Sequence, residues 1–187
     1  MRRVSVVGST GSGKTTFARE LARVRGVPFV ELDALNWGPN WTMVDEAIFR
    51  ARIDDATSGD DWVVDGNYGG RGARAIVWGR ADTVVWLDFP LWLILVRLTR
   101  RNLSRIRSGE EIWPGTGNRE TLRNSYFSRD SLYVWALKTY LRRKRQTPEL
   151  LARPEFAHLE LHRFTRAADA ERWLEAQRRL AAPRIQV

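Results

Sequence analysis

Residues 8–15 read Gly8-Ser9-Thr10-Gly11-Ser12-Gly13-Lys14-Thr15 and match, position for position, the G-x-x-x-x-G-K-[ST] pattern of a phosphate-binding loop. An apolar run over residues 3–7 precedes the motif and predicts a buried strand. The residues that follow, 14–25, have the periodicity of an amphipathic helix. The motif therefore lies between a strand and a helix, which is where a phosphate loop must lie.

The residue types of this loop explain the chemistry that it predicts. Glycines allow consecutive backbone N–H groups to turn toward phosphates, and the helix that follows presents its positive N-terminus to the same anion. Lys14 would then reach the β- and γ-phosphates as a catalytic residue, and the Thr15 hydroxyl would bind Mg²⁺. We expect ATP or GTP to be held by Gly8, Ser9, Thr10, Gly11, Ser12, Gly13, Lys14, Thr15 and Thr16.

Strands and helices alternate along the rest of the chain. Further strands are expected at residues 27–32, 62–65, 83–88 and 159–164, and further helices at residues 44–57, 90–107, 119–145 and 169–180. A turn-rich loop is expected over residues 33–43. This alternation predicts a single α/β domain over residues 1–187, a three-layer sandwich with a five-stranded parallel sheet.

The composition excludes several classes of protein. A hydrophobic content of 43% with nine Trp is enough for a packed core, and the absence of Cys excludes disulfides and thiolate zinc sites. The sequence shows no membrane span and no signal peptide, so we expect a cytoplasmic protein without a membrane partner.

Positive charge is concentrated in one part of the chain. The net charge is +9, and residues 97–145 alone hold thirteen basic and four acidic residues, which accounts for the whole excess. Such a segment suits the phosphates of a nucleotide or of a nucleic acid. The alternative is a solvated helix face in a chain that is rich in Arg throughout.

Aspartates follow three of the expected strands. Asp33, Asp65 and Asp88 stand where strands end, and the carboxyl ends of parallel strands meet at one crevice. Each could instead cap the helix that follows it. We expect Asp65, together with Thr15, to bind Mg²⁺ directly or through water.

A glycine-rich segment separates two basic helices. Residues 109–118 contain three glycines and Pro114, which is typical of a mobile lid, and we place this helical lid at about residues 105–130. Arg119, Arg123 and Arg129 are its candidate catalytic arginines, since phosphoryl transfer depends on positive charge near the γ-phosphate. The alternative for each is a solvent-facing side chain.

Several motifs give the sequence a family resemblance. It resembles the adenylate-kinase-like branch of P-loop NTPases, with a nucleoside monophosphate kinase-like fold, and within that branch the small bacterial topology modulation (adenylate-kinase-related) proteins. The motifs are Leu32-Asp-Ala-Leu-Asn-Trp-Gly-Pro-Asn-Trp41, Val63-Val-Asp-Gly-Asn-Tyr68, Asn118-Arg119 and Ser128-Arg-Asp-Ser131. The resemblance implies that Asp65 lies near Mg²⁺ and that Arg97 and Arg101 contact the adenine and the phosphates.

The acceptor side is less clearly defined by the sequence. We expect an acceptor-site insertion at about residues 33–61, in which Asp33 resembles the substrate-binding carboxylate of shikimate-type kinases. Trp37 and Trp41 could stack on a base or a sugar, or belong to the core. Arg71 is a candidate phosphate clamp, although it lies six residues after Asp65, farther than in adenylate kinases. The acceptor itself is not identified.

Three functions are compatible with these features. The first is an ATP- and Mg²⁺-dependent phosphotransferase that acts on a small-molecule acceptor (a nucleotide, nucleoside or alcohol), as a monomer or homodimer. The alternative is a nucleic-acid-associated P-loop ATPase that binds the phosphodiester backbone with its basic lid. The third is a nucleotide-binding regulatory protein with weak hydrolysis.

Overall fold

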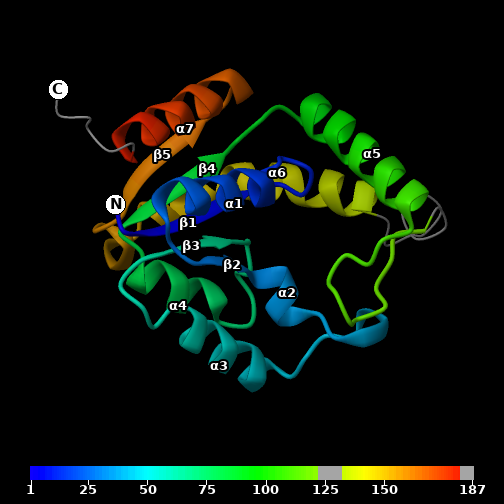
Figure 1. Cartoon of the computed structure of the whole chain (residues 1–187). Helices are drawn as coiled ribbons and strands as arrows, with labels where there is room; N and C mark the ends of the chain where they lie inside the picture. The colour runs from blue at the N-terminus through cyan, green and yellow to red at the C-terminus, as the bar shows by residue number, and fades with distance from the viewer. Residues whose placement is uncertain (122–131, 182–187) are drawn as a thin grey trace, which may run out of the picture.

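The computed structural model describes residues 1–121 and 132–181 (Figure 1). Its sheet consists of β1 (Arg3–Gly8), β2 (Phe29–Glu31), β3 (Trp62–Asp65), β4 (Thr83–Leu87) and β5 (Glu160–Phe164). The strand order is β2-β3-β1-β4-β5, and every pair is parallel. The predicted five-stranded parallel sheet is confirmed.

Helices cover both faces of the sheet and make the predicted three layers (Figure 1). α1 (Lys14–Arg25) and α7 (Ala167–Ala181) pack together on one face. α3 (Glu46–Ala56) and α4 (Ala73–Arg80) lie on the other, where the end of α6 (Leu132–Leu151) joins them. The remaining elements are the long α5 (Leu91–Ser108), the short α2 (Leu32–Asn36), and the 3₁₀ turns η1 (Pro39–Trp41) and η3 (Pro154–Phe156).

Two apolar cores, one on each face, follow from the alternation of side chains along the strands. Val63 and Val85 point toward Phe17 and Leu21 of α1, whereas the adjacent Val64 and Val84 belong to the core beneath α3 and α4. Both faces of the sheet are thus buried, which explains why its central strands read as continuous apolar runs.

The structure corrects two predicted elements. The helix expected to begin at Arg119 does not begin there, because residues 119–121 are not helical; the described part of the helix expected over residues 119–145 belongs to α6, from Leu132 onward. Glu120 is buried beside Arg105, 3.7 Å from its Nη1, and this tertiary contact outweighs the local preference for helix. The loop expected over residues 33–43 contains α2 and η1. Within the described ranges, no helix has the length and apolar character needed to cross a membrane.

Candidate active site

The phosphate loop forms the tight turn that its sequence predicts. Gly11 and Gly13 have φ values of 81° and 86°, in the left-handed region that favours glycine. Gly13 caps α1 without a side-chain hydrogen bond, so the first N–H groups of the helix are left for an anion. The Ser12 hydroxyl is buried and has no hydrogen-bond partner among the described residues.

Lys14, Thr15 and Asp65 meet at the carboxyl ends of β1 and β3. The Thr15 hydroxyl donates a hydrogen bond of 2.5 Å to Oδ2 of Asp65. Burial raises the pKa of the Asp65 carboxyl, and the positive charge of Lys14 opposes that shift. The structure thus brings together the lysine predicted to be catalytic and both predicted metal ligands.

The donors at this point fit a magnesium ion. Oδ1 of Asp65 is buried and has no hydrogen-bond partner in the described part of the chain, which leaves it free to receive a cation or its water. A hydroxyl and a carboxylate are the oxygen ligands that Mg²⁺ takes when nucleotide phosphates and water complete its coordination. Among the described residues, no cluster of three or more His, Asp or Glu side chains is arranged to hold a metal.

Asp33 lies at the start of α2, near enough to Asp65 for its negative charge to help raise the pKa of that carboxyl, and Tyr68 holds it in place. The Tyr68 hydroxyl donates a hydrogen bond of 2.5 Å to Oδ1 of Asp33. Burial, followed by the negative charge of Asp33, raises the pKa of Tyr68, so its hydroxyl remains a donor. The neighbouring Asn67 binds the backbone of Gly8 through both its amide oxygen and its amide nitrogen. The segment after β3 therefore ties Asp33 to the phosphate loop.

Trp37 and Trp41 contact each other, and Trp41 also contacts Trp113 in the predicted lid. The centres of the Trp37 and Trp41 rings lie 5.9 Å apart, edge to face. The centres of the Trp41 and Trp113 rings are also 5.9 Å apart. Trp113 Nε1 donates a hydrogen bond of 3.2 Å to Glu31, the last residue of β2. Stacking on a substrate ring stays a prediction for Trp37 and Trp41, whose described contacts join the acceptor side to the lid.

Asn118 forms a second link between the predicted lid and the predicted acceptor side. Its Oδ1 accepts a hydrogen bond of 2.8 Å from the backbone N of Trp41, and its Nδ2 donates one of 2.9 Å to the carbonyl of Gly38. Its own carbonyl accepts a hydrogen bond of 2.9 Å from Ile112 within the lid. Asn118 is buried, so these bonds fix this part of the predicted lid against η1.

Arg71 is partly buried and already engaged by protein atoms. Its guanidinium donates hydrogen bonds to Oδ1 of Asn36 and to the carbonyl of Val44, and it lies 5.0 Å from the centre of the Phe49 ring. These contacts tie the loop after β3 to the connection between α2 and α3. Acceptor binding by Arg71 stays a prediction.

The two arginines expected near the nucleotide differ in their surroundings. Arg97 donates a hydrogen bond of 2.8 Å to the carbonyl of Ser12, and so supports the phosphate loop from α5. Arg101 is partly buried, and burial lowers the pKa of its guanidinium. Their contacts with adenine and phosphates stay predictions.

Of the three predicted lid arginines, one lies in the described residues. Arg119 has 58% of its side chain exposed, and its Nη2 lies 3.9 Å from Oε1 of Glu111. Arg123 and Arg129 lie outside the described residues. Arg119 is thus exposed and only loosely paired, and its catalytic role stays a prediction.

Two comparisons by sequence find similar proteins over part of the chain. The model of the AAA family, ATPases associated with various cellular activities, matches residues 4–64. A shikimate kinase of Halorhodospira halophila (strain DSM 244 / SL1) is 34% identical over 118 residues, covering 55% of this chain. The match spans 65% of that relative's length.

Solved structures extend the likeness to the whole chain at lower identity. A shikimate kinase from Acinetobacter baumannii in complex with shikimate has a TM-score of 0.57 and 18% sequence identity. The match covers 100% of this chain and 96% of that kinase. The chain has the P-loop kinase fold. A gluconokinase from Sinorhizobium meliloti 1021 shares this P-loop kinase fold, with a TM-score of 0.52 and 19% sequence identity. The match covers 96% of this chain and 93% of the gluconokinase.

Within the P-loop kinase fold, sequence reasoning missed several groups that shape the site. Tyr68 and Asn67 stand in the sequence only as members of a motif, without a predicted role. No local pattern predicts that Trp113 and Asn118 contact the predicted acceptor side. Glycines at 66, 69, 70 and 72 are typical of a tight connection, but they do not indicate which of its side chains lie near Asp33 and the phosphate loop.

Proposed function

We propose that this protein transfers the γ-phosphoryl group of ATP to a hydroxyl of a small-molecule acceptor. The observation that carries the proposal is that two groups of side chains lie near each other. Lys14, Thr15 and Asp65 form the first, and Asp33 with Tyr68 forms the second, close enough for the charge of Asp33 to act on the Asp65 carboxyl. The first group suits a nucleoside triphosphate, and the second is able to orient an alcohol. The shikimate kinase and gluconokinase relatives support a small-molecule acceptor.

The chemistry of the step assigns a role to each residue. The acceptor oxygen attacks the γ-phosphorus, the bond from that phosphorus to the β–γ bridging oxygen breaks, and the acceptor proton passes to the Asp33 carboxylate. Lys14 and the N–H groups at the start of α1 receive the negative charge of the phosphates. Thr15 and Asp65 would hold Mg²⁺, which supplies charge neutralisation between the β- and γ-phosphates when bound.

The lid belongs to the same proposal. We assign to residues 105–130 the closure of the nucleotide side and to residues 33–61 the acceptor side. The bonds from Asn118 and the contact between Trp41 and Trp113 support it, because they connect the two segments directly. A closed lid excludes water, which protects ATP from hydrolysis. We also place the chain with the topology modulation proteins, on the motifs described above.

An acceptor screen tests the proposal. ADP release from Mg·ATP is measured with nucleoside monophosphates, nucleosides, sugar acids and shikimate-like alcohols, against the rate without acceptor. We expect at least one class to raise ADP release and to yield a phosphorylated product, with Lys14→Ala inactive. ATP binding with the same slow ADP release for every acceptor would contradict the proposal and favour the regulatory alternative.

A further inference from the structure

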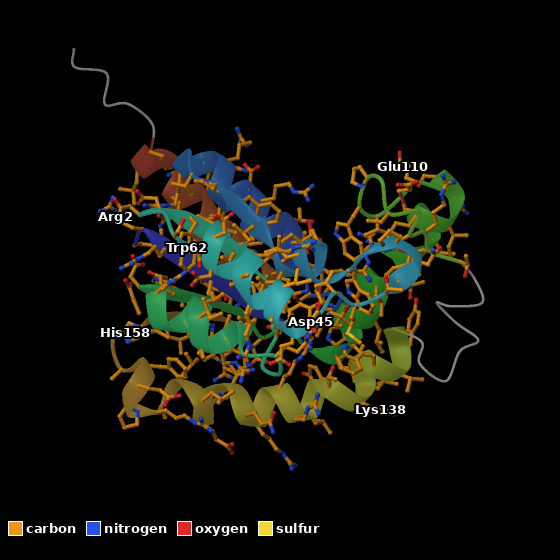
Figure 2. The ribbon with its side chains drawn as sticks, turned by 90° about the horizontal axis from the view of Figure 1, so that it is seen from below. Arg2, Asp45, Trp62, Glu110, Lys138 and His158 are labelled. Atoms are coloured by element: carbon orange, nitrogen blue, oxygen red, sulfur yellow. The ribbon has the colours of Figure 1, made fainter. Side chains whose placement is uncertain are left out.

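Residues 109–118, the lid turn, form a compact unit that follows α5. Ile112 donates a backbone hydrogen bond of 2.9 Å to the carbonyl of Asn118, across the base of the turn. A turn closed by its own hydrogen bonds keeps its side chains in fixed relative positions. Figure 2 shows Glu110, in the lid turn, at the opposite end of the molecule from Arg2, which precedes β1. The lid turn therefore lies toward the carboxyl ends of the strands.

The lid turn docks on the acceptor side through two of its side chains. Asn118, which is buried, binds the backbone of Gly38 and of Trp41. Trp113, which is partly buried, packs edge to face on the Trp41 ring and binds Glu31 at the end of β2. Both side chains thus meet the segment of residues 36–44 that contains η1, the η1 segment.

The backbone of the η1 segment is strained where these contacts meet it. Asn40 and Trp41 have φ values of 55° and 58°, a left-handed conformation that residues other than glycine rarely adopt. Such a conformation persists only where surrounding contacts hold it. Among the described residues, Asn118 binds the backbone N of Trp41, and the rings of Trp37 and Trp113 contact its ring. If the lid turn leaves, two of these three contacts are lost and the segment is free to relax.

The other end of the lid turn is connected to the phosphate loop through α5. Arg97, in the second turn of this helix, donates a hydrogen bond of 2.8 Å to the carbonyl of Ser12. Arg105, in its last turn, has Nη1 3.7 Å from Oε1 of Glu120, two residues after Asn118. A continuous set of contacts thus runs from the phosphate loop along α5 to the lid turn, as coupling between distant sites requires.

We propose that Trp113 and Asn118 are positioning residues that couple nucleotide binding at the phosphate loop to the conformation of the η1 segment. This inference rests on the proposed function, in which residues 105–130 close the nucleotide side, and adds that the lid turn and the η1 segment close as one unit. The nucleotide favours the docked arrangement, because docking fixes Asn118 and thereby brings the adjacent Arg119 to the phosphates. An acceptor bound beside the ordered segment tightens nucleotide binding in return, since coupling is reciprocal.

Hydrogen exchange of backbone amides tests the coupling without an acceptor. Exchange over residues 36–44 is measured by mass spectrometry, with and without Mg²⁺ and a saturating non-hydrolysable ATP analogue. We expect the analogue to slow exchange in the wild-type segment at least about 5-fold. Asn118→Ala and Trp113→Ala should each abolish this slowing while the analogue still slows exchange over residues 8–16. Trp113→Phe should restore part of it, because a ring again contacts Trp41.

The ratio of the two exchange rates separates coupling from a merely structural role, which would speed exchange equally with and without the analogue. The matched control is Trp92→Ala, the same change at an exposed tryptophan of α5, and it should keep the wild-type ratio. Thermal unfolding checks that each variant is folded, and if Asn118→Ala is not, the Trp113 variants decide. A wild-type segment that does not respond to the analogue, or a wild-type ratio in either alanine variant of the lid turn, would overturn the coupling.

A second measurement uses an acceptor found in the screen. The Kd of Mg·ADP is measured by calorimetry with and without saturating acceptor. We expect the acceptor to tighten ADP binding at least about 5-fold in the wild type and to have little effect in Asn118→Ala. An equal gain in both proteins would overturn the coupling and leave the proposed function intact. If no acceptor is phosphorylated but the exchange experiment gives the expected result, the proposed function fails and the coupling stands.

Discussion

The Thr15 hydroxyl donates a hydrogen bond of 2.5 Å to Oδ2 of Asp65, and so joins the first turn of α1 to the end of β3. The bond fixes the position of the carboxylate while its other oxygen, Oδ1, has no partner among the described residues. An unpartnered buried carboxylate oxygen is unfavourable unless a cation or water completes it. The bond thus holds the two proposed metal ligands next to each other.

Asp65→Asn should raise the Mg²⁺ concentration at half-maximal activity by about 10-fold or more, because the shape is kept and the charge is lost. Binding of metal-free ATP should change less. Activity is measured across a Mg²⁺ titration at fixed ATP. Asp61→Asn, just before β3 at the opposite end of that strand, is the control and should keep the wild-type profile. An unchanged Mg²⁺ requirement in Asp65→Asn would show that this carboxylate only supports the loop.

Lys14→Ala should reduce phosphotransfer at least about 100-fold, since it removes the positive charge closest to the transferred group. Lys14→Arg should recover little activity, because the broad guanidinium does not reproduce a compact point charge in a closed loop. ADP release and thermal unfolding are measured for both variants and for Lys138→Ala, an exposed lysine on α6. A Lys14→Ala enzyme with wild-type activity would refute the site.

Tyr68→Phe should raise the KM for the acceptor more than the KM for ATP. The change removes the hydroxyl that orients Asp33 and leaves the ring in contact with Phe49 at 5.1 Å. Steady-state kinetics with both substrates varied give the two constants. Tyr140→Phe is a control, because that ring lies beside Lys144 on α6. Equal rises in both constants would mean that Tyr68 supports the fold rather than the acceptor side.

Glu31→Gln should stabilise the protein at pH 8 and have a vanishing effect near pH 4. Burial, then the charges of Asp65 and Asp33, raises the pKa of the Glu31 carboxyl in the folded state. The folded wild type therefore loses stability as the pH rises from the unfolded pKa of about 4.3, whereas glutamine has no charge to bury. Glutamine also keeps an oxygen for Trp113.

Tm measured from pH 4 to pH 8 for wild type and Glu31→Gln tests this expectation. The difference in Tm should grow with pH. A constant difference, or a less stable Glu31→Gln protein at pH 8, would show that the charged carboxylate is favourable where it lies.

Local patterns in the sequence were sufficient for the phosphate loop and for most of the fold. The helix expected over Lys14–Arg25 has those bounds in the structure, because glycines in the left-handed region begin and end it. The apolar runs at β3 and β4 likewise became buried central strands. These features depend on residues that are close in sequence.

Such local patterns do not predict contacts between residues that are far apart in the sequence. Tyr68 and Asp33 lie 35 residues apart, and Arg163 binds Asp88 across 75 residues, so that Asp88 forms an ion pair rather than a helix cap. Arg143 is one of many arginines in the sequence of a basic helix, and only the tertiary structure places it with Arg74 at one cavity beside Gly8 and Ser9. Side-chain pairing of this kind depends on the tertiary structure.

The lid arginine separates the phosphotransferase from the nucleic-acid alternative. Arg119 is exposed and weakly paired with Glu111, so a mutation there should not disturb the fold. If the lid closes over ATP, Arg119→Ala should lower kcat about 10-fold or more with a smaller change in ATP affinity, because its charge acts as negative charge redistributes in the transition state.

If the basic segment instead binds nucleic acid, Arg119→Ala should weaken DNA binding equally for all sequences and flatten its salt dependence. Kinetics with the best acceptor and DNA titrations at two salt concentrations are run on the wild type, Arg119→Ala and Arg107→Ala, an exposed arginine in the last turn of α5. In a closing lid, an arginine acts only if it is positioned at the phosphates, so Arg119→Ala should lower kcat and Arg107→Ala should not. A nucleic-acid surface requires charge alone, so both variants would weaken binding alike. We expect the first result, because Asn118, next to Arg119, is fixed to the acceptor side by two hydrogen bonds.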